Sequence, residues 1–203
     1  MQQLIKDLIK KGYLITPNII DAFVFIDRID FVPENLKDEA YRDIPLSIGH
    51  GQTISQPLTV AFMLELLKPN KGEKILDIGS GSGWQSSLLA HIVGDGGKVF
   101  AVELIPELSE IGKENARRYK FNNIKFIAGD GSRGLEQEAP FDKIIVAAAA
   151  FEKIPEELYK QLKIGGRLVI PVDNSIWLVV KKDENKFEEK EFPGFVFVPL
   201  IEK

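Results

Sequence analysis

A run of alternating glycines at residues 79–83 is the feature that most constrains what this chain can fold into. It follows the apolar, β-prone residues 74–78 and leads into residues 85–90, which have helical character. A buried strand, a tight glycine turn and a helix N-terminus form the front edge of a nucleotide-binding βαβ unit. Glycine is needed in such a turn because the backbone visits positive φ and because a ligand lies against bare backbone. The pattern therefore predicts an α/β fold with a nucleotide-like ligand.

The spacing of these glycines indicates which kind of ligand. Dinucleotide-binding enzymes favour G-x-G-x-x-G, in which the helix N-terminus faces a pyrophosphate. Here Gly79, Gly81 and Gly83 give G-x-G-x-G, and the acid Asp77 precedes them. This variant suits an adenosine ligand without phosphates, and the carboxylate suits a cation. S-adenosylmethionine, which carries an ammonium and a sulfonium group, meets both conditions. A glycine-rich turn alone is equally consistent with an ordinary loop.

Acidic residues at the ends of the next two expected strands support a nucleoside ligand. Glu103 ends the strand expected at residues 98–103. It lies about 20 residues beyond the glycines, where an acid holds a ribose diol. Asp130 and Gly131 follow the strand expected at residues 124–129 and can meet an adenine amino group and its ring edge. The alternatives are a surface carboxylate for Glu103 and a simple turn for Asp130.

The remaining periodicities complete an alternating order of strands and helices. Helices are expected at residues 106–120 and 155–162. Such an alternation implies a mostly parallel sheet with ligands at its carboxyl edge. The last strands are expected to form an antiparallel pair that closes the sheet. Strands are expected at residues 142–147, 167–172, 176–182 and from 187 onward, including 195–198.

The first quarter of the chain is interpreted as a small helical cap followed by a long connection. Residues 2–11 and 17–26 have apolar side chains at helical spacing. Residues 41–57 are rich in glycine, proline and hydroxyl groups, and we expect them to form a loop without regular structure. Long loops of this kind in compact domains are usually functional. Ser55 lies two residues before Pro57, so its hydroxyl could cap the following helix or act in a site.

Composition and charge exclude several other classes of function. A net charge of −4 and the lack of any long basic cluster argue against nucleic-acid binding. The chain has no cysteine, which excludes disulfides and thiolate chemistry and fits a reducing compartment. The uncharged residues 44–64 contain prolines, glycines and polar groups that lipid would leave unpaired. His50 and His91 are isolated and make no metal site. We therefore expect a cytoplasmic protein that binds no nucleic acid, membrane or metal.

Several segments resemble those of the protein-L-isoaspartate O-methyltransferase family. The glycine turn occurs across S-adenosylmethionine-dependent methyltransferases. The Gly-Gln-Thr-Ile-Ser segment at residues 51–55 and the closing Phe-Val-Pro-Leu at 197–200 point to this one family. The resemblance covers nearly the full length, through residues 41–46, 51–57, 77–85, 129–131, 139–142, 161–172 and 197–200.

This resemblance implies a fold and an activity. The fold is a Rossmann-like S-adenosylmethionine-dependent methyltransferase fold: a mostly parallel seven-stranded sheet, an antiparallel C-terminal edge and a small N-terminal helical cap. Residues 1–203 would form one domain, with a cap and substrate loop at 1–57 and a cofactor-binding core at 58–203. The reaction would move a methyl group from S-adenosylmethionine to the free α-carboxylate of L-isoaspartyl, and possibly D-aspartyl, residues. Its partners would be damaged proteins and peptides that contain such residues.

The resemblance also implies the roles of individual residues. Ser55 stands at the family's proposed catalytic serine. Substrate contacts are implied for Thr53, Ile54, Ser55, Ala147 and Val198. Three alternatives stay open: another S-adenosylmethionine-dependent methyltransferase, a non-catalytic S-adenosylmethionine-binding module, and a nicotinamide dehydrogenase, which the glycine spacing disfavours. Cofactor contacts are implied for Gln52, Thr53, Ile54, Asp77, Gly79, Ser80, Gly81, Gly83, Glu103, Leu104, Asp130 and Gly131.

Overall fold

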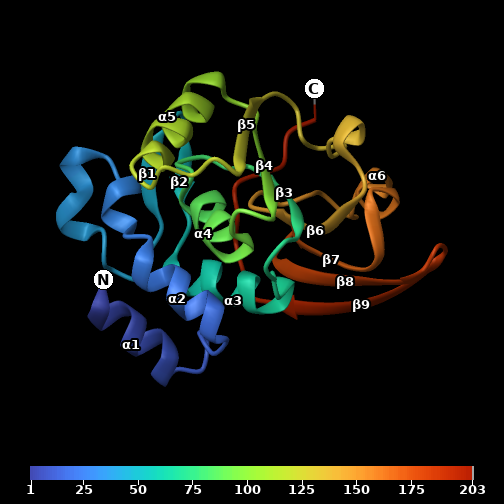
Figure 1. Cartoon of the computed structure of the whole chain (residues 1–203), viewed down its shortest axis with the longest axis horizontal. Helices are drawn as coiled ribbons and strands as arrows, with labels where there is room; N and C mark the ends of the chain where they lie inside the picture. The colour runs from blue at the N-terminus through green and yellow to red at the C-terminus, as the bar shows by residue number, and fades with distance from the viewer. Residues whose placement is uncertain (203) are drawn as a thin grey trace.

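A seven-stranded sheet in the order β5-β4-β3-β6-β7-β8-β9 forms the centre of the computed structural model, which describes residues 1–202 (Figure 1). Strands β3 to β7 pair in parallel, and β7-β8-β9 form an antiparallel edge. The expected fold class is therefore confirmed. The strands are β3 (Lys74–Ile78), β4 (Lys98–Glu103), β5 (Ile124–Ala128), β6 (Phe141–Val146), β7 (Leu162–Val172), β8 (Ser175–Asp183) and β9 (Lys186–Pro193).

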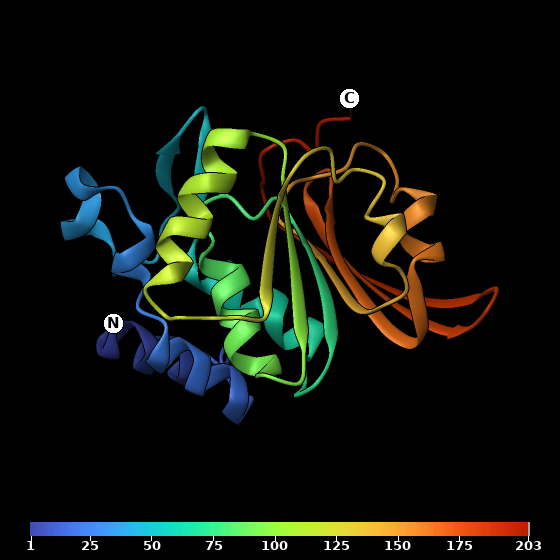
Figure 2. The same ribbon diagram turned by 45° about the horizontal axis from the view of Figure 1, so that its top comes forward.

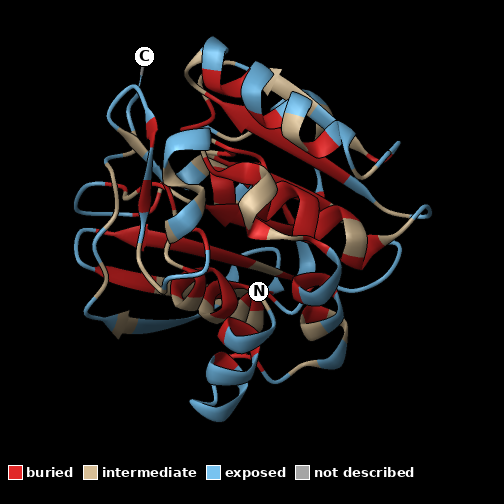
Figure 3. Cartoon of the chain, turned by 90° about the vertical axis from the view of Figure 1, so that its left-hand side faces the viewer, coloured by how far each residue is buried: buried red, intermediate tan, exposed pale blue. Residues whose placement is uncertain are grey.

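Helices cover both faces of this sheet. Neighbouring residues along a strand point to opposite faces, so Ile75 belongs to one hydrophobic core and Leu76 to the other. Figure 2 shows α4 and α5 on one side of the strands and α6 on the other. The central strands β3, β4 and β6 and the inner sides of the helices are mostly buried, whereas the edge strand β9 is largely exposed (Figure 3). The bounds are α3 (Pro57–Leu67), α4 (Trp84–Val93), α5 (Pro106–Arg117), η3 (Glu136–Glu138) and α6 (Glu156–Lys160).

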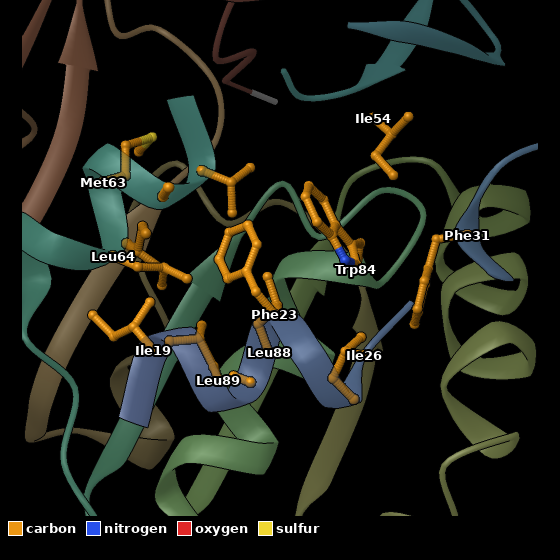
Figure 4. Packing of buried hydrophobic residues seen from close by; sticks show 14 of the residues in the cluster. Ile19, Phe23, Ile26, Phe31, Ile54, Met63, Leu64, Trp84, Leu88 and Leu89 are labelled. Carbon is orange, nitrogen blue, oxygen red and sulfur yellow. The ribbon is translucent and has the colours of Figure 1, made fainter. Parts of the chain in front are cut away.

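The N-terminal cap packs against α3 and α4. Phe23 lies edge-on to Trp84 with 5.6 Å between ring centroids, and both side chains are fully buried. Figure 4 shows these two rings in one cluster with Ile54, which joins the cap, α4 and the segment before α3. Glu65 of α3 accepts the Thr16 hydroxyl at 2.6 Å. The cap consists of α1 (Gln2–Lys10), α2 (Pro17–Phe25), η1 (Arg28–Phe31) and η2 (Glu34–Glu39).

The connection before α3 is not the irregular loop that the sequence predicts. It contains a short antiparallel hairpin, β1 (Leu46–Gly49) and β2 (Gln52–Ile54). Residues Gly49, His50 and Gly51 all have positive φ and make its turn. Strands of four and three residues are too short for a periodicity to reveal them. We call β1, its turn and β2, with the adjoining Ser55, the site hairpin.

Two further expectations about the C-terminal half are wrong. The helix expected at residues 155–162 does not reach Leu162, because α6 stops at Lys160 and β7 begins at Leu162, before the strand expected from residue 167. Gly165 and Gly166 lie in β7 beside a bulge, where the register with β6 shifts. Residues 195–198 do not extend the last strand either, because β9 ends at Pro193. This segment returns to the end of β6, where the Val198 carbonyl accepts the amide of Ala149 at 2.8 Å. No helix within residues 1–202 is long and apolar enough to cross a membrane.

Candidate active site

A cavity of about 480 Å³ lies at the carboxyl edge of the sheet. Its walls come from the glycine turn after β3, the end of β4, the residues after β6, the site hairpin and residues 198–201. The strand order reverses between β3 and β6, and this reversal point is where open α/β sheets bind ligands. The volume falls in the range of roughly 300–1,000 Å³ that is usual for small-molecule sites. The cavity is therefore the candidate active site.

Most of the residues that the sequence analysis assigned to the site meet at this cavity. Asp77, Gly83 and Asp130 do not line it. The assigned residues in its wall are Gln52, Thr53, Ile54, Ser55, Gly79, Ser80, Gly81, Glu103, Leu104, Gly131, Ala147 and Val198.

The glycine turn serves the ligand at one end and helix packing at the other. Gly79 and Gly81 have φ of 80° and 48° and present bare backbone to the cavity. A Cβ on Gly83, whose φ is 83°, would lie 2.6 Å from the carbonyl oxygen of Gly112 in α5. Gly83 therefore permits the close approach of α4 and α5, and its expected ligand contact stays a prediction. Ser80 lies between Gly79 and Gly81. Its hydroxyl is buried without a hydrogen-bond partner, which leaves it available to a ligand in the cavity.

Glu103 presents a carboxylate that two backbone amides hold in place. One oxygen accepts the amide of Gly81 at 2.9 Å, and the other accepts the amide of Ile105 at 3.0 Å. The residue is only 6% exposed and lines the cavity. Each carboxylate oxygen can accept a further hydrogen bond. The group is thus oriented to accept a pair of neighbouring hydroxyl groups such as those of a ribose.

Asp77 lies outside the cavity wall and contacts the residues that begin α4. Its carboxylate accepts the Gln85 amide at 2.8 Å and the Ser86 hydroxyl at 2.6 Å. Burial raises the pKa of Asp77 to about 6, against the opposing effect of these two hydrogen bonds. Gln85 itself lines the cavity. Asp77 thus adjoins the cavity through Gln85, and its expected contact with a cationic ligand stays a prediction.

We expect Asp77→Asn to raise the unfolding free energy of the ligand-free protein near neutral pH. The pKa of Asp77 is about 6 in the folded protein and 3.8 ordinarily, so the folded state favours the neutral carboxyl. The contribution of Asp77 to the stability of the wild type is therefore highest at low pH and falls as the pH rises from about 4 to about 6. Asparagine can still accept from Gln85 and can donate to Ser86. The gain should be about 2 to 3 kcal/mol at pH 7 and should shrink toward pH 4. Denaturant unfolding across this pH range measures it; a difference that did not vary with pH would contradict the assignment.

Asp130 orders the turn that presents Gly131. One carboxylate oxygen of Asp130 accepts the backbone amide of Ser132 at 2.8 Å. Gly131 lines the cavity, and a Cβ there would approach Ile78 to 2.9 Å. The close packing therefore demands glycine, and Asp130 supports the turn next to it.

The structure also bears on the helix-capping interpretation of Ser55, one of the two that its position left open. Gln56, not Ser55, is the N-cap residue of α3. The first turn of that helix is served by Asp43, whose carboxylate accepts the Leu58 amide at 2.9 Å. The helix-capping interpretation of Ser55 is wrong. Ser55 lies in the cavity wall.

Sequence reasoning missed several residues of the cavity wall. Trp84 and Gln85 follow the glycine turn directly, so their position at the start of α4 could have indicated them. Leu200 belongs to the family-specific segment 197–200 but, like Ile201, gave no local signal of a place in the cavity, because both reach it through a long-range crossing. Leu200 donates its amide to the Ala149 carbonyl at 2.7 Å, and Ala149 donates to Val198 at 2.8 Å. The missed wall residues include Ile48, His50, Ser82, Trp84, Gln85, Leu200 and Ile201.

The ionisable groups of the wall are few. Among the residues that line the cavity, Glu103 and His50 are the titratable ones. Within residues 1–202, no group of three or more histidine, aspartate or glutamate side chains is arranged to hold a metal ion. The chemistry that these residues offer is therefore binding and orientation.

Comparison with known proteins agrees with this geometry. The protein-L-isoaspartate O-methyltransferase of Ignicoccus hospitalis is 43% identical over 207 residues, covering 100% of this chain and 97% of the relative. Protein-L-isoaspartate O-methyltransferase 2 of Archaeoglobus fulgidus is 49% identical over 185 residues, covering 90% and 84%. A crystal structure described as a protein-L-isoaspartate O-methyltransferase from Plasmodium falciparum, in complex with S-adenosyl-L-homocysteine, superposes with a TM-score of 0.86 at 26% identity, covering 98% and 97%. The family profile matches residues 1–203, and the chain belongs to the protein-L-isoaspartate(D-aspartate) O-methyltransferase family.

Proposed function

We propose that this chain is a protein-repair methyltransferase that uses S-adenosylmethionine to methylate isoaspartyl residues. The methyl group goes to the free α-carboxylate of an isoaspartyl residue in a damaged protein or peptide. The observation that carries the proposal is one cavity in which the glycine turn, Glu103 and the family-specific residues 51–55 meet. Membership of the family and the S-adenosyl-L-homocysteine bound to a structural neighbour support it.

The residues present fit the cofactor. The bare backbone of Gly79 and Gly81 and the unpartnered hydroxyl of Ser80 would hold the methionine part. Glu103 would accept the ribose hydroxyls, and Gly131 would lie against the adenine. S-adenosylmethionine supplies an electrophilic methyl group on a positively charged sulfur. A carboxylate in the wall complements that positive charge.

The isoaspartyl carboxylate that accepts the methyl group must be oriented, but it needs no general base. A carboxylic acid with an ordinary pKa near ~4 is already ionised at neutral pH, so nothing has to remove its proton. The work left to the protein is to hold the carboxylate oxygen in line with the methyl carbon. We assign this to the hydroxyl groups of Thr53 and Ser55, with Ala147 and Val198 completing the substrate side of the cavity. The new O–C bond forms as the C–S bond breaks, and the electron pair leaves with sulfur.

The function is tested with two peptides that differ only in aspartate against isoaspartate. Each is incubated with the protein and S-adenosylmethionine labelled on its methyl group. We expect a base-labile methyl ester on the isoaspartyl peptide alone. Equal labelling of both peptides would indicate a different methyltransferase. Tight cofactor binding with no label on either would indicate a binding module.

We expect Glu103→Ala to weaken binding of S-adenosylhomocysteine roughly tenfold or more. Hydrogen bonds to a charged group contribute about 1.5 to 3 kcal/mol each. Calorimetry on the mutant measures the dissociation constant, and circular dichroism checks that it is folded. Glu107→Ala is the matched control, because Glu107 is an exposed acid in the first turn of α5. An affinity equal to that of the control would show that Glu103 does not touch the ligand.

We also propose that residues 1–203 act as one domain in the cytoplasm. The cap shares its buried cluster with α3 and α4 through Phe23 and Trp84, which favours unfolding of cap and core together. The absence of cysteine from the sequence is compatible with a reducing compartment.

A further inference from the structure

Arg28 is a fully buried arginine whose guanidinium binds four backbone carbonyl groups. Nη1 donates to the carbonyls of Ala40 and Arg42 at 2.8 and 3.1 Å. Nη2 donates to those of Ile44 and Ser55 at 2.9 and 3.1 Å. The side chain has an exposure of 0%. Every hydrogen on the two terminal nitrogens therefore has its own acceptor.

Two of these four carbonyls, those of Ile44 and Ser55, mark the base of the site hairpin, and the other two lie between η2 and β1. Ile44 precedes β1, and Ser55 follows β2. The chain leaves the guanidinium at Ile44, runs out along the hairpin and returns to the same group at Ser55. Arg28 itself belongs to η1 in the cap, which its N-cap Asp27 supports by accepting the Ile29 amide at 3.2 Å. One side chain thus ties the cap to both ends of the segment that carries the substrate side of the cavity.

The same guanidinium also packs on the cofactor side. Its central carbon lies 5.4 Å from the centroid of the Trp84 ring, within the range of a cation–π contact. Trp84 lines the cavity directly after the glycine turn. Arg28 therefore touches an element from each half of the site.

Arginine is suited to this position in a way that lysine is not. Burial lowers the pKa of Arg28 to about 10, and the nearby Asp43 opposes the change, so the group stays charged at neutral pH. Its planar fork has donors directed to separate acceptors, whereas an ammonium is a point charge with three donors. A lysine would leave carbonyl groups at the hairpin base without partners.

We propose that Arg28 is a positioning residue that fixes the base of the site hairpin, and through it the hydroxyl of Ser55, relative to Trp84 and the cofactor half of the cavity. The proposal rests on the function proposed above for the reaction that it serves. Arg28 acts through the residues that it holds and does not line the cavity.

The test compares Arg28→Lys with the wild type in three measurements. We expect the dissociation constant for S-adenosylhomocysteine to change by no more than about threefold, because the glycine turn and Glu103 are untouched. Turnover at saturating isoaspartyl peptide should fall by roughly tenfold to a hundredfold, because small misplacements of reacting groups are costly. Amide hydrogen exchange in residues 46–55 should quicken by about tenfold or more while β3 and β4 stay protected.

A matched control separates positioning from simple loss of stability. Ile19→Ala removes a fully buried side chain from α2 and makes no change at the hairpin base. If its melting temperature equals that of Arg28→Lys, the Ile19→Ala variant should still have near-normal turnover, and amide hydrogen exchange in residues 46–55 should remain slow. If Arg28→Lys behaved like this control, the proposal would be overturned. If the lysine variant does not fold, Arg28→Gln, which leaves no buried charge, is used in its place. If neither variant folds even with ligand present, Arg28 is a general structural residue, and the proposal is overturned too.

Amide hydrogen exchange also allows the proposal about Arg28 to be tested independently of the proposed function. A wild type that does not methylate isoaspartyl peptide would refute the function. The exchange of residues 46–55 in the two Arg28 variants would still decide whether Arg28 fixes the hairpin.

Discussion

Replacing Ser55 with alanine is expected to lower turnover on isoaspartyl peptide by about a hundredfold, because a displacement near one ångström of the reacting carboxylate costs that much. The unfolding free energy should stay within about 0.5 kcal/mol of the wild type. The hydroxyl caps no helix, since Gln56 is the N-cap of α3 and Asp43 serves its first turn. The backbone carbonyl of Ser55, which Arg28 binds, is unchanged by the mutation. Steady-state kinetics and a melting curve on the same preparation measure both quantities.

Ser47→Ala is the matched control for this mutation. It removes the same hydroxyl from β1 of the same hairpin, at an exposed position that does not line the cavity. We expect it to leave turnover near that of the wild type. Equal losses in the two variants would mean that the hairpin, and not the Ser55 hydroxyl, sets the rate.

Replacing Gly83 with alanine is expected to be the most damaging single-methyl change in the glycine turn. Its φ of 83° disfavours any residue with a Cβ, and the added atom would lie 2.6 Å from the Gly112 carbonyl oxygen. Left-handed backbone and overpacking together should cost roughly 2 to 5 kcal/mol of unfolding free energy. Because α4 would have to move away from α5, the affinity for S-adenosylhomocysteine should fall as well. Denaturant unfolding and calorimetry measure the two effects.

Gly12→Ala isolates the contribution of backbone strain. Gly12 has a similar φ of 76°, but a Cβ there would meet nothing within 4 Å. We expect a loss of about 1 to 2 kcal/mol with unchanged ligand affinity. If Gly83→Ala were no worse than this control, the contact between α4 and α5 would be looser than the structure indicates.

The network behind the cavity explains why the cap belongs to the enzyme. Phe23 and Arg28 of the cap both pack on Trp84, which lines the site. A change in the cap can therefore reach the substrate side without touching a ligand. The expected sensitivity of turnover to Arg28 is one consequence of this arrangement.

Local patterns in the sequence determined the fold class and the cofactor half of the candidate site. The alternating glycines at 79–83 indicate a single βα turn, and Glu103 indicates the end of the neighbouring strand. Parallel strands bring their carboxyl ends to one edge, so such residues meet whenever the sheet forms. The α/β fold class was predicted on this basis, the seven-stranded sheet and the family from the resemblance carried by segments such as residues 51–55 and 197–200, and all three are confirmed. The ligand contacts of these residues stay predictions.

Where local pattern and tertiary packing compete, the sequence alone does not identify hydrogen-bond partners. Ser55 before Pro57 has the pattern of a helix cap, yet the carboxylate of Asp43, fifteen residues before Leu58, accepts the Leu58 amide instead. Asp77 before the glycines has the pattern of a ligand contact, yet Gln85 and Ser86 on the next helix take its carboxylate. A hydrogen-bond partner is chosen by distance in space, and spacing along the chain does not report that distance.

The sequence by itself thus determined the alternating fold class and its glycine turn, because these depend on the period of burial and on backbone conformations that only glycine adopts freely. It determined the family through the specific residues at 51–55 and 197–200. The tertiary structure alone decided that Leu200 reaches the cavity and that Arg28 holds both ends of the site hairpin. Those contacts join segments that no short pattern links. They form because a buried guanidinium or amide must find acceptors wherever the folded chain places them.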